Sequence, residues 1–128
     1  MQDMEQAFVT ELYGIAGPVY PMIAPDNSLA PFVVYTKSKI EYMKTLDGTS
    51  HTRQGWYDID LIDKTYQGLQ AKFALVKAKL LSFARQRIGV DGPFVQDVTM
   101  DNIVEFFDDG PMYYRMHFEI HFFYEEAI

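Results

Sequence analysis

The chain carries two pairs of residues whose types could do chemistry, the acids Asp58 and Asp60 and the histidines His117 and His121. On a helix, two histidines four residues apart could hold zinc. Both pairs lie, however, in runs where apolar and polar residues alternate, which indicates β-strands. Along a strand the two histidines would be roughly 13 Å apart, too far to share one metal ion. The two carboxylates would be about 7 Å apart on one side, where they could bind a cation or exchange protons.

Sequence spacing places no further acid, histidine or nucleophile beside Asp58 and Asp60. A solvated or interface position is therefore the simpler interpretation of that pair. The glycines form no phosphate-binding pattern, and no serine lies in a Gly-x-Ser-x-Gly turn. We accordingly expect no catalytic residue, no bound metal and no cofactor.

A basic segment stands out in an otherwise acidic chain of 128 residues and formal net charge −7. The basic residues of this segment are Lys37, Lys39, Lys44, His51 and Arg53. The simpler interpretation is a solvated hairpin. The alternative is an arm that reaches an acidic neighbour, which could be a copy of the same protein in a head-to-tail ring. The single tryptophan, Trp56, follows directly and would either pack in the sheet or anchor an interface.

The overall composition is that of a folded domain with an acidic surface. Hydrophobic residues make up 48% of the chain, enough for one core, so we expect a single domain over residues 1–128. The acidic balance argues against a protein that reads nucleic-acid sequence. The start of the chain lacks the pattern of a signal peptide, and no run is as long as a membrane span. Residence in a cytoplasm is the expected location.

Apolar spacing predicts two helices. The first is expected from Asp3 to Ile15 and is ended by Gly17 and Pro18. The second would be capped by Asp63 or Thr65 and has the clearest amphipathic pattern in the chain. Its apolar stripe consists of Leu69, Phe73, Val76, Leu80 and Phe83.

The remaining patterns predict strands and turns. We expect a short edge piece or irregular run over 19–23 and strands over 32–43, 56–62, 95–107 and 114–124. The 95–107 strand is expected to be broken or bent in its middle. The polar segment 45–55 is expected to be a mobile loop between two strands. This order predicts an α+β fold with a mostly antiparallel β-sheet and two α-helices packed on one face.

Several short runs occur in order along nearly the whole chain. They are Val19-Tyr20-Pro21, Pro31-Phe32-Val33-Val34-Tyr35, Asp47-Gly48, Trp56-Tyr57-Asp58-Ile59-Asp60-Leu61, Thr65-Tyr66 and Tyr114-Arg115-x-His117-Phe118-Glu119-Ile120. Together with the two helices, this ordered set resembles the tail-completion, or tail-terminator, proteins of long-tailed bacteriophages and prophages.

The resemblance implies a virion subunit that forms a hexameric ring at the head-proximal end of the tail tube, after synthesis in the host cytoplasm. There it would stop tube polymerisation, contact the tail-tube protein and the head-completion or connector protein, and let DNA pass without specific binding. The resemblance carries no enzyme activity, catalytic residue or cofactor with it. The segment 45–55 matches the family's variable arm. The expected subunit-contact residues are Lys44, Asp47, His51, Arg53 and Trp56.

Two other functions stay open at this point. A head–tail connector or head-completion protein would bind the portal-side ring instead of the tube. A small α+β enzyme or ligand-binding domain would need a deep pocket with converging polar groups between sheet and helix. Two expected features suit a ring subunit. An acidic surface can line a DNA channel, and a neighbour's strand can extend a free sheet edge.

Overall fold

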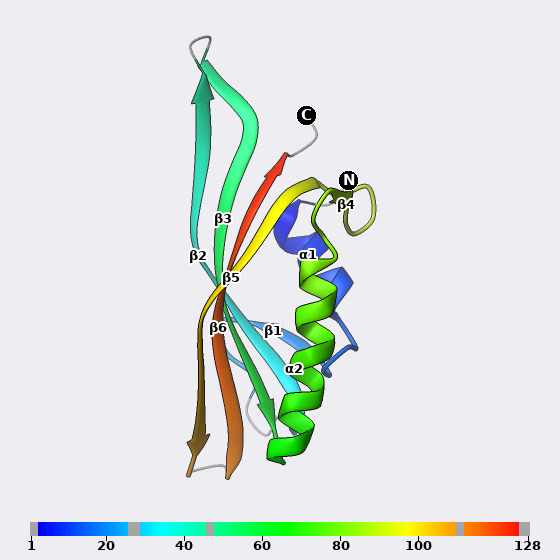
Figure 1. The fold of residues 1–128 in the computed structure, drawn as a ribbon, viewed down its shortest axis with the longest axis vertical. Coiled ribbons are helices and arrows are strands. Elements are labelled where there is room, and N and C mark those ends of the chain that lie inside the picture. The colour runs from blue at the N-terminus through cyan, green and yellow to red at the C-terminus, as the bar shows by residue number, and fades with distance from the viewer. Residues whose placement is uncertain (1–2, 26–28, 46–47, 110–111, 126–128) are drawn as a thin grey trace.

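The structure, a computed structural model, describes residues 3–25, 29–45, 48–109 and 112–125, without the side chains of 43–51 and 108. Its helices and strands are α1 (Met4–Leu12), β1 (Val19–Pro21), β2 (Phe32–Thr45), β3 (Gly48–Asp63), α2 (Tyr66–Leu81), β4 (Gln86–Arg87), β5 (Phe94–Asp108) and β6 (Tyr113–Glu125). The strands form one sheet in the order β1-β2-β3-β6-β5-β4 (Figure 1). Only the β1–β2 pair is parallel among these strands, which confirms the predicted α+β class.

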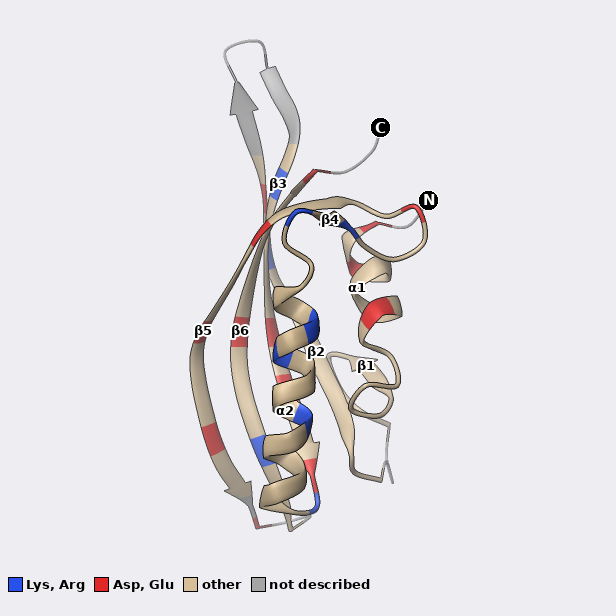
Figure 2. Cartoon of the chain, turned by 45° about the vertical axis from the view of Figure 1, so that its right-hand side comes forward, with Lys and Arg blue, Asp and Glu red and all other residues tan. Residues whose placement is uncertain are grey.

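Both helices cover the same face of the sheet, as predicted (Figures 1 and 2). Strand alternation places every second side chain of the central strands β3 and β6 under them. The core that results joins α1, α2 and the five strands β1, β2, β3, β5 and β6. It includes Phe8, Leu12, Val33, Tyr57, Ile59, Leu61, Leu69, Val76, Leu80, Phe118, Ile120 and Phe122. A smaller buried cluster of Ala30, Phe32, Val34 and Ile62 forms separately from this core.

Local capping explains where each helix begins and ends. Asp3 and Gln6 form a capping box, in which Gln6 N donates to Asp3 Oδ1 at 2.8 Å and Asp3 N donates to Gln6 Oε1 at 3.1 Å. The helix ends at Leu12 and not at Ile15, because Tyr13 is extended and Gly14 has a φ of +87°. Of the two residues predicted to cap α2, Thr65 is the N-cap. Its Oγ1 accepts a hydrogen bond from Gly68 N at 3.0 Å. Neither described helix is long and apolar enough to cross a membrane.

The prediction of a loop over 45–55 is wrong for residues 48–55. β3 begins at Gly48, and its first half pairs with β2 in the register Tyr42↔Arg53 and Lys44↔Thr49. This ladder satisfies backbone N–H and C=O groups that a loop would leave to water. β6 reaches only Thr52, so β2 and β3 continue past it as a two-stranded hairpin (Figure 1). The sequence of residues 48–54 is polar and has no apolar alternation from which a strand could be recognised.

The predicted bend in the 95–107 strand is confirmed. The register of β5 against β6 shifts between Asp101 and Val104, and Asn102 has a φ of +54°. A β-bulge of this kind bends a strand and increases its twist. β4 was not predicted, because a strand of two residues has no periodicity to recognise.

Candidate functional site

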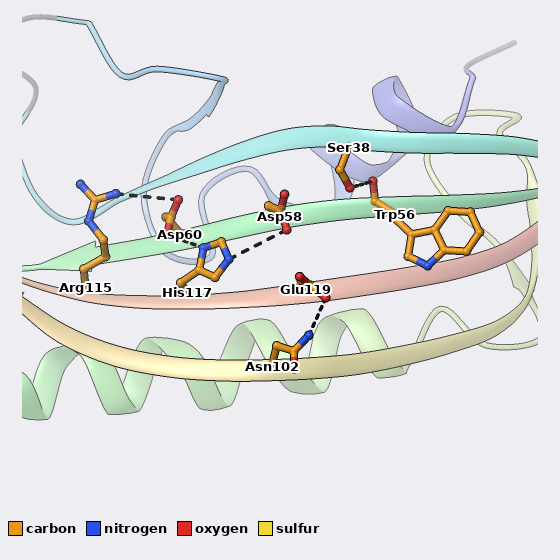
Figure 3. Close-up of polar contacts among 8 residues, drawn as sticks. All are labelled: Ser38, Trp56, Asp58, Asp60, Asn102, Arg115, His117 and Glu119. Atoms are coloured by element: carbon orange, nitrogen blue, oxygen red, sulfur yellow. Dashed lines mark hydrogen bonds and ion pairs between the residues drawn. The ribbon is translucent and has the colours of Figure 1, made fainter.

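The face of the sheet opposite the helices presents a row of polar side chains from β3 and β6, here called the polar face (Figure 3). Trp56 pairs with His121, Asp58 with Glu119 and Asp60 with His117. These residues alternate with the buried Tyr57, Ile59 and Leu61 of β3, so they must point away from the core. The sequence patterns predicted this alternation, and the strand register brings the side chains into contact.

His117 lies between Asp58 and Asp60 of β3. Its Nδ1 is 2.9 Å from Asp60 Oδ1, and its Nε2 is 3.9 Å from Asp58 Oδ1. Arg115 Nη1 lies 3.8 Å from Asp60 Oδ2. A carboxylate that orients an imidazole can serve acid–base catalysis, but the reaction also needs a group for the imidazole to activate. The serine in this region, Ser38, donates its hydroxyl to Trp56 O at 2.9 Å, so it is engaged elsewhere (Figure 3).

Three carboxylates lie in one register row across the middle of the sheet. Asp58 is opposite Glu119, and Glu119 is opposite Asp101. Asn102 Nδ2 donates to Glu119 Oε2 at 2.7 Å. Like charges directly opposite each other weaken a sheet. Among the described residues no group of three or more His, Cys, Asp or Glu is arranged to hold a metal ion.

Trp56, one of the predicted interface residues, has contacts on both sides of its ring. Its ring stacks on the ring of His121 with centroids 4.4 Å apart and planes 7° apart. Lys39 Nζ lies 4.9 Å from the same indole ring, a cation–π contact. His121 Nε2 is in turn 3.0 Å from Gln54 Oε1. The tryptophan therefore forms part of a layered group at the root of the β2–β3 hairpin.

Arg53, another predicted interface residue, does not lie beside Trp56. Arg53 lies three positions away, on the opposite side of the strand, with its guanidinium carbon 4.2 Å from the centre of the Tyr42 ring. The backbones of Lys44 and His51 belong to β2 and β3, but their side chains, like all of Asp47, lie outside the described residues. Subunit contact by these five residues stays a prediction. The sequence analysis did not single out Arg115, Asn102 and Glu119, since their proximity depends on pairing between distant strands.

A pocket of about 300 Å³ lies between the start of α1 and the root of the hairpin. It is lined by Asp3, Met4, Glu5, Lys37, Ile40, Tyr42, Tyr57 and Tyr124. Glu5 is engaged on both oxygens, because the Tyr35 hydroxyl donates to Oε2 at 2.8 Å and Lys37 Nζ lies 3.1 Å from Oε1. The Tyr35 hydrogen bond, with a smaller contribution from Lys37, holds the pKa of Glu5 below its ordinary value. These contacts fasten α1 to β2.

Replacing Glu5 with glutamine is expected to cost about 1 kcal/mol of folding free energy at pH 7, a modest amount because the carboxylate is partly exposed. Since the folded-state pKa is lowered, the stabilisation is present above the unfolded pKa of about 4.5 and is lost as pH falls through the folded value. Urea unfolding should therefore show a larger difference between wild type and Glu5→Gln at pH 7 than at pH 3. Glu41→Gln, which removes an exposed carboxylate from β2, is the control. An equal difference at both pH values would contradict this account.

Comparison with known proteins shows a shared fold. No family model matches the sequence, and no curated protein matches it. Among solved structures, a chain of the "Virion of native gene transfer agent (GTA) particle" is similar with a TM-score of 0.63 and 14% sequence identity. The likeness covers 91% of this chain and 84% of that chain. At this identity the match shows that the fold is one used in a virion.

Proposed function

We propose that the protein is a structural subunit of a tailed, phage-type virion that caps the head-proximal end of the tail tube. In this role it forms a ring, stops tube polymerisation and provides the surface that joins the tail to the head. The observation that carries the proposal is the fold, which matches a chain of a gene transfer agent virion over nearly all of its length. The order of sequence runs shared with tail-completion proteins narrows the role to the end of the tube.

Charge and shape are consistent with this role. A net charge of −7 suits a ring whose opening DNA must cross without binding. The β2–β3 hairpin continues past the last residue of β6 that pairs with β3 (Figure 1). An extension of this kind can reach a neighbouring subunit or the tube. The polar face presents side chains that contact one another, and such a surface can also contact a neighbouring subunit.

The direct test mixes the purified chain with tail tubes assembled from the tail-tube protein encoded in the same genome. We expect density at one end of each tube in negative-stain electron microscopy, and tube length that stops increasing once the chain is added. Tail-tube and head-completion genes beside the coding gene would support the same role. Binding to the portal-side ring with none to tubes would refute the capping role and indicate a head–tail connector.

A further inference from the structure

The sheet has two edges that are unpaired over most of their length. β1 pairs only with Val33–Tyr35 of β2, and β4 only with Phe94 and Val95 of β5. From Thr36 onward β2 therefore has one partner strand among the described residues, and from Gln96 onward so does β5. Unpaired edges are templates for another strand. The edge formed by β1 and by β2 from Thr36 onward is called here the β1–β2 edge. The edge formed by β5 from Gln96 onward is called the β5 edge.

The two edges carry opposite charges. β5 has four acidic residues and no lysine or arginine between Phe94 and Asp108, as the red segments of Figure 2 indicate. The acidic residues are Asp97, Asp101, Glu105 and Asp108. On the β1–β2 edge, β2 has three lysines, Lys37, Lys39 and Lys44, against the single acid Glu41. The side chains of Lys37 and Lys39 are about half exposed, and they pair with Glu5 at 3.1 Å and with Glu41 at 3.0 Å. Two copies would attract each other when unlike edges meet and repel when like edges meet, which favours head-to-tail over two-fold contact.

The opposite charges lie at the same level along the strands. Lys39 is in register with Trp56, Trp56 with His121, and His121 with Thr99. Thr99 lies between the two acidic residues Asp97 and Asp101. A second copy placed beside the first in the same orientation would therefore bring basic and acidic groups together. β2 and β5 run antiparallel to each other, since each adjacent pair between them is antiparallel, so the facing strands have a favourable direction.

Exposed apolar side chains lie below the charges on both edges. Those of the β1–β2 edge are Met22, Ile23 and Leu29, which are about three-quarters exposed or more. Those of the β5 edge are Ile103, Val104, Phe106 and Phe107. Met22 N donates to Tyr35 O, which fixes the level of Met22 on β2. Across the sheet, Tyr35 pairs with Ile59 and Ile59 with Phe118. Phe118 lies opposite the bulge that precedes Val104 in β5. The two apolar groups are thus level with each other too.

The β5 edge also offers a hollow that a side chain could enter. It has a volume of about 220 Å³ and is lined by Tyr66, Leu69, Glu105, Phe106, Phe107 and Tyr114. Gln70 Nε2 donates to Glu105 Oε1 at 2.8 Å, which ties the acid to α2 and leaves the aromatic rings to form the rest of the wall. Solvent-exposed apolar groups on two opposite edges, at one level, are the expected surface of a repeating contact.

We infer that copies of this chain associate laterally, with the β1–β2 edge of one copy on the β5 edge of the next. Each copy uses both edges, so the contact repeats from copy to copy, and in the proposed function the repeat closes into a ring. The inference deepens the proposed function and rests on it for ring closure, whereas the contact itself rests on the matched charges and apolar groups. The partner is a second copy of this chain in the same orientation.

A charge exchange tests the contact. At the level of Lys39 and Thr99, the variant Lys37→Glu/Lys39→Glu is acidic on both edges, and Asp97→Lys/Asp101→Lys is basic on both edges, with Glu105 and Asp108 left unchanged further along β5. Each alone should associate at least about tenfold more weakly than wild type in sedimentation velocity. An equimolar mixture should regain association through contacts between unlike variants only, since each acidic edge then meets a basic one. Lys64→Glu/Lys77→Glu, with the same change of charge at exposed positions away from both edges, should associate as wild type does.

An apolar substitution tests the same contact independently. Ile23→Asp, at a side chain that is 80% exposed, should weaken association at least about tenfold while leaving the thermal unfolding of the dilute protein unchanged. Leu75→Asp is the matched control, because Leu75 is 57% exposed on α2 and away from both edges. It should leave association unchanged.

The outcomes separate this inference from the proposed function. Rings that form equally well in all edge variants, or folded charge variants that do not recover on mixing, overturn the edge assignment and leave tube capping standing. Lateral association that follows the predictions, in a chain that never binds tail tubes, supports the edge contact and overturns tube capping. A wild-type chain that stays monomeric at every concentration and on tubes overturns both.

Discussion

Replacing Phe8 with alanine is expected to lower the free energy of unfolding by about 3–5 kcal/mol. Phe8 is fully buried, and its ring lies 5.5 Å from Tyr35, 5.2 Å from Tyr57 and 5.8 Å from Phe122, centroid to centroid. These partners belong to β2, β3 and β6, so one side chain joins α1 to three strands. Domains are commonly stable by only about 5–15 kcal/mol, so this loss is a large fraction of the total stability.

Urea unfolding followed by tryptophan fluorescence measures this loss, because the chain has a single tryptophan and Trp56 lies in the sheet. Tyr13→Ala is the control, because Tyr13 immediately follows the same helix and is 64% exposed. Removing its side chain should cost less than about 0.5 kcal/mol of unfolding free energy. A cost below about 1.5 kcal/mol for Phe8→Ala would mean that α1 does not pack on the sheet as described.

Gly17→Ala is expected to destabilise the fold by about 3 kcal/mol or more, which for a change of one methyl group is a large effect. Gly17 has a φ of +95°, which L side chains rarely adopt. A Cβ placed there would lie 2.3 Å from Pro31 O, far inside contact distance. The backbone cannot easily yield, because Val33 N donates to Pro18 O at 2.9 Å and holds the two segments together.

Gly14→Ala separates the two causes. Gly14 has a similar φ of +87°, but nothing lies within 4 Å of the Cβ position. It should therefore cost only the backbone strain, about 1–2 kcal/mol. The difference between the two midpoints in thermal unfolding then measures the clash with Pro31. Equal losses for both variants would refute the close approach of these two segments.

The sequence predicted best where one face of an element is buried. In β6 the alternation from Tyr114 to Tyr124 fixes both the strand and the side that packs on the helices. In α2 the apolar stripe did the same, and Leu69, Val76 and Leu80 are indeed buried. Burial on one side leaves a period in the sequence, and the period is what can be recognised.

Prediction failed where no period exists. Residues 48–55 are strand, but the β2–β3 hairpin continues beyond the sheet, so polar residues can occupy both of its sides. The polar face was also only half predictable. Asp60 and His117 were each assigned to the outer side of a strand, yet their contact at 2.9 Å follows from a pairing of residues 57 positions apart. Local sequence determines which way a side chain points, whereas register between distant strands determines what it meets.

The position of β6 in the sheet has a consequence for how the chain folds as it is made. β6 is the last of the strands in chain order, yet it lies between β3 and β5 near the middle of the sheet. Until residues 113–125 have left the ribosome, β3 and β5 have no bridge between them, and the core residues of α2 face an incomplete sheet. Pairings such as Thr52↔Glu125 close long loops, which makes folding slow. The complete sheet can therefore form only after β6 has been synthesised, and a shorter nascent chain leaves core residues of β3, β5 and α2 uncovered.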